Sequence, residues 1–154
     1  MHIPAKVDYG MRALLELARS GEPETGEALA RAQELPTKFL VAILTDLRRA
    51  GFITSQRGMA GGYRLSRPAS EITVADVIRA LDGPLAEVRG LRPEMTPYEG
   101  AAEHLQEVWV AARASLRSVL EQVSVADIVE DHLPPHVAAL VADPDSWSPR
   151  VRTI

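Results

Sequence analysis

The sequence predicts a mainly α-helical fold, in which a winged helix-turn-helix domain is followed by a long C-terminal helix. Residues 4–49 contain three apolar stripes with helical spacing, and residues 52–66 resemble two short strands around a glycine-rich turn. Residues 96–123 carry the longest apolar stripe of the chain. Three helices joined by short turns form a helix-turn-helix core. The predicted hairpin that follows would be its wing.

Each core helix has its own signal. The first is expected over residues 4–19 and the second over 26–34, each with one apolar face. The third begins after Pro36, whose missing N–H suits a first helical turn. Gly51 stands where a left-handed cap is expected. The apolar residues of this third helix follow the spacing i, i+3, i+4 and i+7: Leu40, Ile43, Leu44 and Leu47.

Helical patterns return after Pro68. Thr73 and Asp76 have the spacing of a capping box, and Ser124 and Asp127 repeat it in an almost identical heptapeptide. The long helix would extend about 36 Å at 1.5 Å per residue. We divide the chain into a winged-helix domain (1–84), a linker or sensor loop (85–97), a dimerisation helix with the short helix after it (98–131) and a tail (132–154). The tail should contain a short helix near 136–142 and a loose end.

The apolar stripe of the long helix is longer than a small winged domain can cover. A second copy of the chain is the simplest partner for it, so we expect a homodimer. An alternative for Trp109 is the wall of a small-molecule pocket. The residues expected at the dimer interface are Leu105, Trp109, Ala112, Leu116, Val119, Leu120 and Val123.

Composition limits the function. The 154 residues are 46% hydrophobic and 25% charged, and no run approaches the about 18 apolar residues that a membrane span needs. The N-terminus is interrupted by charge and does not resemble a signal peptide, so we expect a cytoplasmic protein without a membrane partner. The chain has no cysteine, which excludes disulfides, thiolate zinc sites and cysteine-ligated iron–sulphur clusters.

Charge points to a nucleic-acid partner. The net charge is −4, yet residues 35–68 hold six basic side chains and a single acidic one, Asp46, a balance of +5. A basic segment in an acidic protein favours an anionic partner, and the fold makes double-stranded DNA the leading candidate. A winged-helix module that binds proteins instead of DNA is the alternative. No nucleophile–base–acid set or phosphate-binding motif is recognisable, so we do not expect an enzyme.

DNA contacts are expected from two elements. The second helix of a helix-turn-helix enters the major groove, with its N-terminal residues at base edges. An arginine on the wing can enter the minor groove, and glycines would let the wing backbone approach a sugar-phosphate strand. The residues expected to contact DNA are Thr37, Lys38, Phe39, Val41, Arg48, Arg57, Gly58, Gly61, Gly62, Tyr63 and Arg64. Val41 or, as the alternative, Ala42 could lie against a thymine methyl group, which is a less directional contact.

Metal binding has weak support. His104 with Glu103 or Glu107 supplies too few ligands on one helix. His132 and His136 have ligand-like spacing, but the two prolines between them prevent the one-face helix that such a pair needs. We therefore expect no metal.

Several segments resemble the Rrf2 family of winged-helix transcriptional regulators. One of them lies in the first helix, with PAK at residues 4–6, Tyr9, and RA at residues 12–13. The others are LRRAGFI (47–53), RGMAGGYRL (57–65) and ITVADVI (72–78). The resemblance implies a homodimer with crossed C-terminal helices, a repressor on a partly palindromic operator. It also implies that Lys6 and Tyr9 contact the DNA backbone and that Arg57 enters the minor groove.

The sequence departs from the family in two respects. Val41 and Ala42 stand where cluster-binding relatives can carry polar side chains that read bases, so the resemblance does not give the operator sequence. The other departure concerns the cluster. Relatives that bind an iron–sulphur cluster carry three cysteines in the loop before the long helix, whereas residues 86–102 contain none. Asp8 matches a carboxylate that some of these relatives use as a fourth ligand, but it cannot hold a cluster alone. We therefore expect no cofactor, and a small molecule or protein as effector at residues 85–104 and the long helix.

Overall fold

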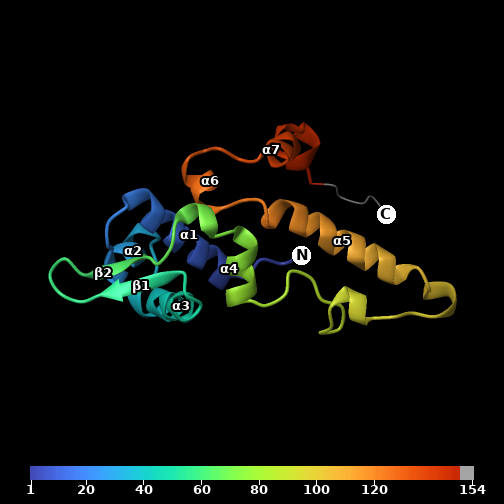
Figure 1. Cartoon of the computed structure of the whole chain (residues 1–154), viewed down its shortest axis with the longest axis horizontal. Coiled ribbons are helices and arrows are strands. Elements are labelled where there is room, and N and C mark those ends of the chain that lie inside the picture. The colour runs from blue at the N-terminus through green and yellow to red at the C-terminus, as the bar shows by residue number, and fades with distance from the viewer. Residues whose placement is uncertain (150–154) are drawn as a thin grey trace.

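The computed structural model describes residues 1–149, so part of the predicted loose tail lies outside the described residues. Figure 1 shows a helical domain carrying a hairpin at one end, with a long helix extending from the other. This is the predicted winged-helix class. The helices are α1 (Ala5–Ser20), α2 (Gly26–Ala32), α3 (Thr37–Arg49), α4 (Val74–Leu81), α5 (Leu105–Leu120), α6 (Val125–Val129) and α7 (Pro135–Ala142). The strands are β1 (Ile53–Gln56) and β2 (Gly62–Leu65), and the short 3-10 turns are η1 (Ala69–Glu71), η2 (Pro93–Met95), η3 (Gly100–Ala102) and η4 (Pro144–Trp147).

The core of the domain is built by α1, α3 and α4, with α2 packed on α3. The apolar stripe predicted for α3 is buried in full, at 0–3% exposure for Leu40, Ile43, Leu44 and Leu47. Gly51 follows α3 with a φ of +80°, the left-handed conformation that favours glycine. The apolar stripe and the glycine cap that the sequence predicted for α3 are therefore confirmed.

The wing consists of β1, β2 and the turn between them. Its strands pair antiparallel, from Ile53 opposite Leu65 to Gln56 opposite Gly62. A third stretch of backbone joins β2 from the other side: the Tyr63 N–H donates to the Glu24 carbonyl at 2.7 Å, and the Glu24 N–H donates to the Tyr63 carbonyl at 2.9 Å. Strand β2 of the wing is thus fastened, at its end nearest the turn, to the segment that precedes α2.

Gly62 makes this close approach feasible. Its φ is +146°, and a Cβ added there would lie 2.6 Å from the Glu24 carbonyl oxygen. Gly62→Ala is therefore expected to displace the start of β2 and to lower the free energy of unfolding by about 1–3 kcal/mol. Urea denaturation measures this change.

Gly58→Ala is the matched control for that variant. Gly58 also has a positive φ, +107°, but no atom lies within 4 Å of its added Cβ. Both variants carry backbone strain, whereas only Gly62→Ala adds a clash with backbone. Equal losses in the two variants would contradict the role assigned to the Glu24 contact.

Both predicted capping boxes are present and they lie side by side. The Thr73 hydroxyl accepts from the Asp76 N–H at 3.1 Å, and the Ser124 hydroxyl accepts from the Asp127 N–H at 3.1 Å. The two box segments pair as an antiparallel bridge, in which the N–H of Val74 donates to the carbonyl of Val123 at 2.9 Å. This pairing brings the chain back to the winged domain after α5.

The return segment completes the domain core. Helix α6 packs against α1, and Val125 is fully buried together with core residues such as Val7 and Leu14. The core of the predicted 1–84 domain therefore includes a residue from the segment that the sequence analysis assigned to dimerisation.

The long helix is shorter than predicted. It begins at Leu105 instead of near Thr96, because residues 96–104 form a loop with the η3 turn. Pro97 disfavours helical backbone at Thr96, whose buried hydroxyl donates to the Pro93 carbonyl at 2.8 Å, and Gly100 takes a φ of +61°. None of the helices within residues 1–149 is long and apolar enough to cross a membrane.

The predicted tail helix is present as α7. It lies beside α5 in Figure 1, and His136 Nε2 is 2.7 Å from the Ser118 carbonyl of α5. Val137 is buried, whereas Leu140 and Val141 are 53% and 43% exposed.

Candidate nucleic-acid interface

The outward face of α3 is formed by side chains that lie opposite its buried stripe. They follow the spacing i, i+4, i+7 and i+11: Lys38, Ala42, Thr45 and Arg49. Lys38, Ala42 and Arg49 are exposed and Thr45 is half-buried. We call these four residues the α3 outer row. Thr45 and Arg49 were absent from the residues predicted to contact DNA, although the same helical spacing that identified the core stripe would have identified them.

Lys6 and the α3 outer row are connected through Asp46. Lys6 Nζ lies 2.7 Å from Asp46 Oδ2, and Arg49 Nη1 lies 3.6 Å from Asp46 Oδ1. The hydrogen bond from Lys6 lowers the pKa of the Asp46 carboxyl below its ordinary value. Asp46 therefore holds two cations of α1 and α3 at one edge of the outward face.

Tyr9 and Phe39 form an aromatic pair beside this edge. Their ring centroids are 5.8 Å apart with an interplanar angle of 83°, an edge-to-face arrangement. Phe39 is 46% exposed, and Tyr9 packs partly against the core. The other predicted α3 residues are less accessible: Thr37 and Val41 are half-buried, and Val41 lies beside Gly26 of α2.

The wing presents unpaired cations. Arg57 and Arg64 are exposed, and neither has an ion-pair partner within residues 1–149. Met59, in the turn, is fully exposed. Arg48 Nη1 lies 3.4 Å from Ser55 Oγ and links the end of α3 to β1. Arg48 thus joins the end of α3 to the wing through a hydrogen bond to a wing serine.

The glycines of the wing have roles within the chain. Gly58 has a positive φ in open space, whereas Gly61 lies against the backbone of Gln56 and Gly58 in the turn. Gly62 and Tyr63 lie against Glu24, and the Tyr63 ring is half-buried. Gly61 and Gly62 therefore allow close approaches within the protein's own backbone, and the expected approach of the wing to a sugar-phosphate strand stays a prediction.

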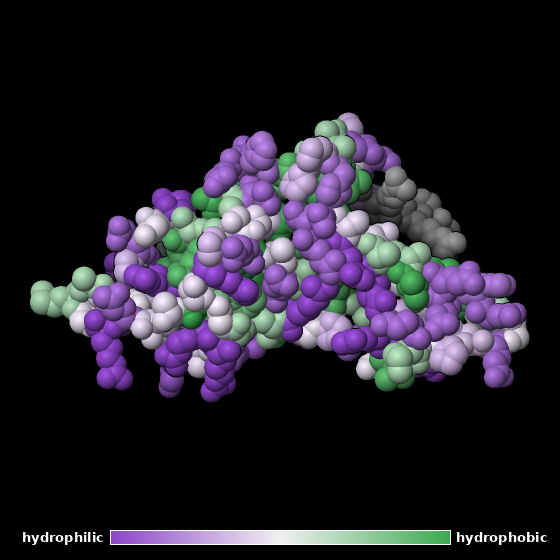
Figure 2. Space-filling model, in the orientation of Figure 1, coloured by the Kyte–Doolittle hydropathy of each residue, from purple (hydrophilic) through white to green (hydrophobic). Residues whose placement is uncertain are grey.

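These elements lie on one side of the domain. In Figure 1, α3 and the hairpin occupy the lower edge of the winged half of the molecule. Figure 2 shows hydrophilic side chains projecting from this edge. Because an α-helix fits the major groove of B-DNA and a basic wing fits the adjacent backbone or minor groove, the arrangement suits one face of a duplex.

The apolar residues of α5 are covered only in part by the described chain. No residue of α5 is buried, and Trp109 and Val108 are 37% and 56% exposed. We call Leu105, Trp109, Ala112, Leu116 and Val119 the α5 row. Of the other predicted dimer residues, Leu120 packs against the domain core, and Val123 lies beyond the helix and is only 6% exposed.

The histidines do not assemble a metal site. His104 Nδ1 is 3.1 Å from Glu107 Oε1, and His136 is engaged with the Ser118 carbonyl. Within residues 1–149 no group of three or more His, Cys, Asp or Glu side chains could hold a metal ion.

A helix-turn-helix with an accessible second helix, joined to a basic wing, defines a winged-helix DNA-binding transcriptional regulator. Comparison with known proteins leads to the same class. Residues 3–131 match the model of the Rrf2 family, described as iron-dependent transcriptional regulators. The chain belongs to the Rrf2 family.

Similar proteins carry regulator names. A Mycobacterium tuberculosis protein named as an HTH-type transcriptional regulator is 48% identical over 145 residues, covering 93% of this chain and 90% of the relative. CymR of Bacillus subtilis is 34% identical over 130 residues, covering 83% of this chain and 89% of CymR. These names favour a DNA-binding regulator over both an enzyme and a protein-interaction module.

Solved structures agree with the fold. The structure of CymR, described as the global cysteine regulator of B. subtilis, has a TM-score of 0.73 at 30% identity and covers 85% of this chain and 98% of that one. IscR of T. potens has a TM-score of 0.69 at 27% identity and covers 96% and 97%.

The family description mentions iron, and the residues of this chain do not fit an iron–sulphur cluster. The sequence has no thiolate ligand, and residues 86–102 contain no cysteine in the loop that precedes α5. Asp8, the matching carboxylate, lies on α1 with Arg12 Nη1 at 3.9 Å. Its chemistry here is that of a charged side chain in the first turn of a helix.

Proposed function

We propose that the protein is a cytoplasmic, homodimeric, sequence-specific repressor that binds a partly palindromic operator. In this proposal the α3 outer row reads the major groove, Arg57 enters the minor groove, and Lys6, Tyr9, Arg48 and Arg64 contact the backbone. The observation that carries the proposal is the joint exposure of Lys38 and Arg48 on α3 and of Arg57 and Arg64 on the wing, none of which has an ion-pair partner within residues 1–149.

The α5 row supports the homodimer. A helix of 16 residues without one buried side chain gains little from its own chain, and its apolar residues recur every three or four positions. A second α5 would cover this row in a symmetric pair. Two copies of α3 would then face two half-sites of one duplex.

The cysteine-free loop supports a signal other than an iron–sulphur cluster. We infer that the effector is a small molecule or a protein that acts on residues 85–104 and α5.

Two experiments test the DNA proposal. Genomic fragments retained by the purified protein are sequenced, which identifies the operator and its neighbouring genes. Binding to that operator is then titrated with salt. If about six phosphates are neutralised per dimer, the logarithm of the association constant should fall linearly with the logarithm of the salt concentration, with a slope of about −5. Retention of no specific fragment, or an affinity that ignores salt, would contradict the proposal.

A further inference from the structure

A cavity of about 430 Å³ lies where α4, the loop after it and α5 meet. This volume is in the range of small-molecule sites. Residues 83–86 form one wall, and four arginines line the rest: Arg79, Arg92, Arg113 and Arg117. Glu94 is the only acidic residue among the lining residues that the structure describes.

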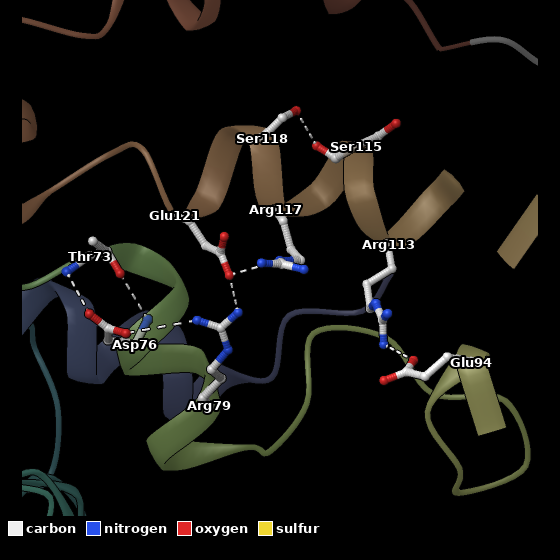
Figure 3. Close-up of polar contacts among 9 residues, drawn as sticks. All are labelled: Thr73, Asp76, Arg79, Glu94, Arg113, Ser115, Arg117, Ser118 and Glu121. Atoms are coloured by element: carbon white, nitrogen blue, oxygen red, sulfur yellow. Dashed lines mark hydrogen bonds and ion pairs between the residues drawn. The ribbon is translucent and has the colours of Figure 1, made fainter. Parts of the chain in front are cut away.

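The cavity has more arginines than carboxylates to pair with them. Arg113 is ion-paired with Glu94, while Arg79 and Arg117 share Glu121, with Arg117 Nε at 3.0 Å from Glu121 Oε1 (Figure 3). These hydrogen bonds hold the pKa of Glu121 below its ordinary value, with that from Arg79 the largest cause.

Two further features leave positive charge in the cavity. Asp76, on the side of Arg79 away from α5, is more distant at 3.8 Å. Arg92 has no ion-pair partner within residues 1–149. A guanidinium does not lose its proton in proteins, so the four arginines outnumber the three carboxylates Glu94, Glu121 and Asp76 by one positive charge, which an added anion would offset.

We propose that this cavity binds a small organic anion with two or more acidic groups, and that binding there changes the affinity of the dimer for DNA. The guanidinium fork matches both carboxylate and phosphate groups with paired hydrogen bonds, so both sources share the required chemistry. The second half of this inference rests on the proposed function.

The position of the cavity explains how the two events would be coupled. Arg79 belongs to α4, which packs on α1 and α3, whereas Arg113 and Arg117 belong to α5. Arg113 and Arg117 project about a quarter turn away from the α5 row, so a dimer partner on that row leaves them accessible from the loop side. An anion that joins them to Arg79 would fix the angle between the winged domain and α5.

That angle controls DNA binding in a dimer. The α5 pair would set the distance between the two α3 helices, and a duplex accepts only separations of about one helical turn. Near the cavity, the two parts are linked by the Arg79–Glu121 ion pair, beside the packing of Leu120 on the domain core. An anion would compete with Glu121 for Arg79 and Arg117, and would thereby replace this link with another geometry.

Binding is tested by calorimetry on the full chain, with citrate as the carboxylate probe and fructose 1,6-bisphosphate as the phosphate probe at constant ionic strength. Arg92→Gln should weaken binding of the active probe at least about tenfold, because it removes a charged hydrogen-bond donor without leaving a carboxylate unpaired. The paired substitution Glu94→Gln with Arg113→Gln should weaken it too. Arg31→Gln, which removes an exposed arginine from α2, is the control.

The outcomes separate the cavity from the function. Absence of binding by both probes, or equal binding by Arg92→Gln and the wild type, would overturn the site. If the active probe binds, it should change the Kd for operator DNA at least about threefold in the wild type and not in Arg92→Gln. An unchanged Kd would overturn the coupling. Failure of the protein to bind DNA both with and without the active probe would instead overturn the proposed function, whatever calorimetry shows.

Discussion

Arg57→Ala is expected to weaken operator binding at least about 30-fold. A base or groove contact by an arginine is worth about 1–3 kcal/mol, and a dimer presents this side chain twice. Arg57 is exposed at the turn of the wing and has no ion-pair partner within residues 1–149, so its removal costs nothing inside the chain. Fluorescence anisotropy with the operator measures the Kd.

The control for this variant is Arg89→Ala, which removes the same charge from the loop after α4. Arg89 stacks over Tyr98 at 5.7 Å, on a segment that does not belong to the wing or to α3. Its operator affinity should stay within about twofold of the wild type. If Arg57→Ala binds as tightly as this control, the wing has no part in DNA binding.

Leu116→Asp is expected to dissociate the dimer. Leu116 lies in the middle of the α5 row, and a paired α5 would bury an unpaired carboxylate there at a cost of several kcal/mol. Because Leu116 is not buried within its own chain, the monomer should still fold. Sedimentation measures the mass, and circular dichroism measures the retained helix.

Ala114→Asp is the control for this variant, because it adds the same charge to the opposite face of α5. Ala114 is exposed on the opposite side of the helix, about half a turn from Leu116. It should remain dimeric under the conditions that dissociate Leu116→Asp. A Leu116→Asp variant that remains dimeric would show that the dimer interface lies elsewhere. If the variant is monomeric, its operator affinity relative to the wild type measures how much binding depends on two half-sites.

The sequence predicted those parts of the fold whose signals are local. The stripe of α3, the cap at Gly51, both capping boxes and the hairpin depend on residues within one or two turns of each other. The start of α5 was placed too early, because residues 101–104 are helix-compatible by composition. The backbone of Thr96, Pro97 and Gly100, which the prediction passed over, sets the true boundary.

The candidate site was predicted in part for a related reason. Exposure of Lys38, Arg57 and Arg64 follows from local pattern, and the structure agrees. The link between Lys6 and Asp46 joins residues far apart in the chain, and no spacing rule predicts it. The same holds for Glu24, whose contact with Gly62 and Tyr63 gives these wing residues an internal role.

The backbone bridge between Thr73 and Ser124 bears on how the molecule can be divided. A fragment that stops after α4 would lose Val125 from beneath α1, leaving a hole among the innermost side chains. We therefore expect such a fragment to be less stable than the full chain, and a minimal DNA reader to gain stability from α6 grafted behind α4 through a short artificial linker.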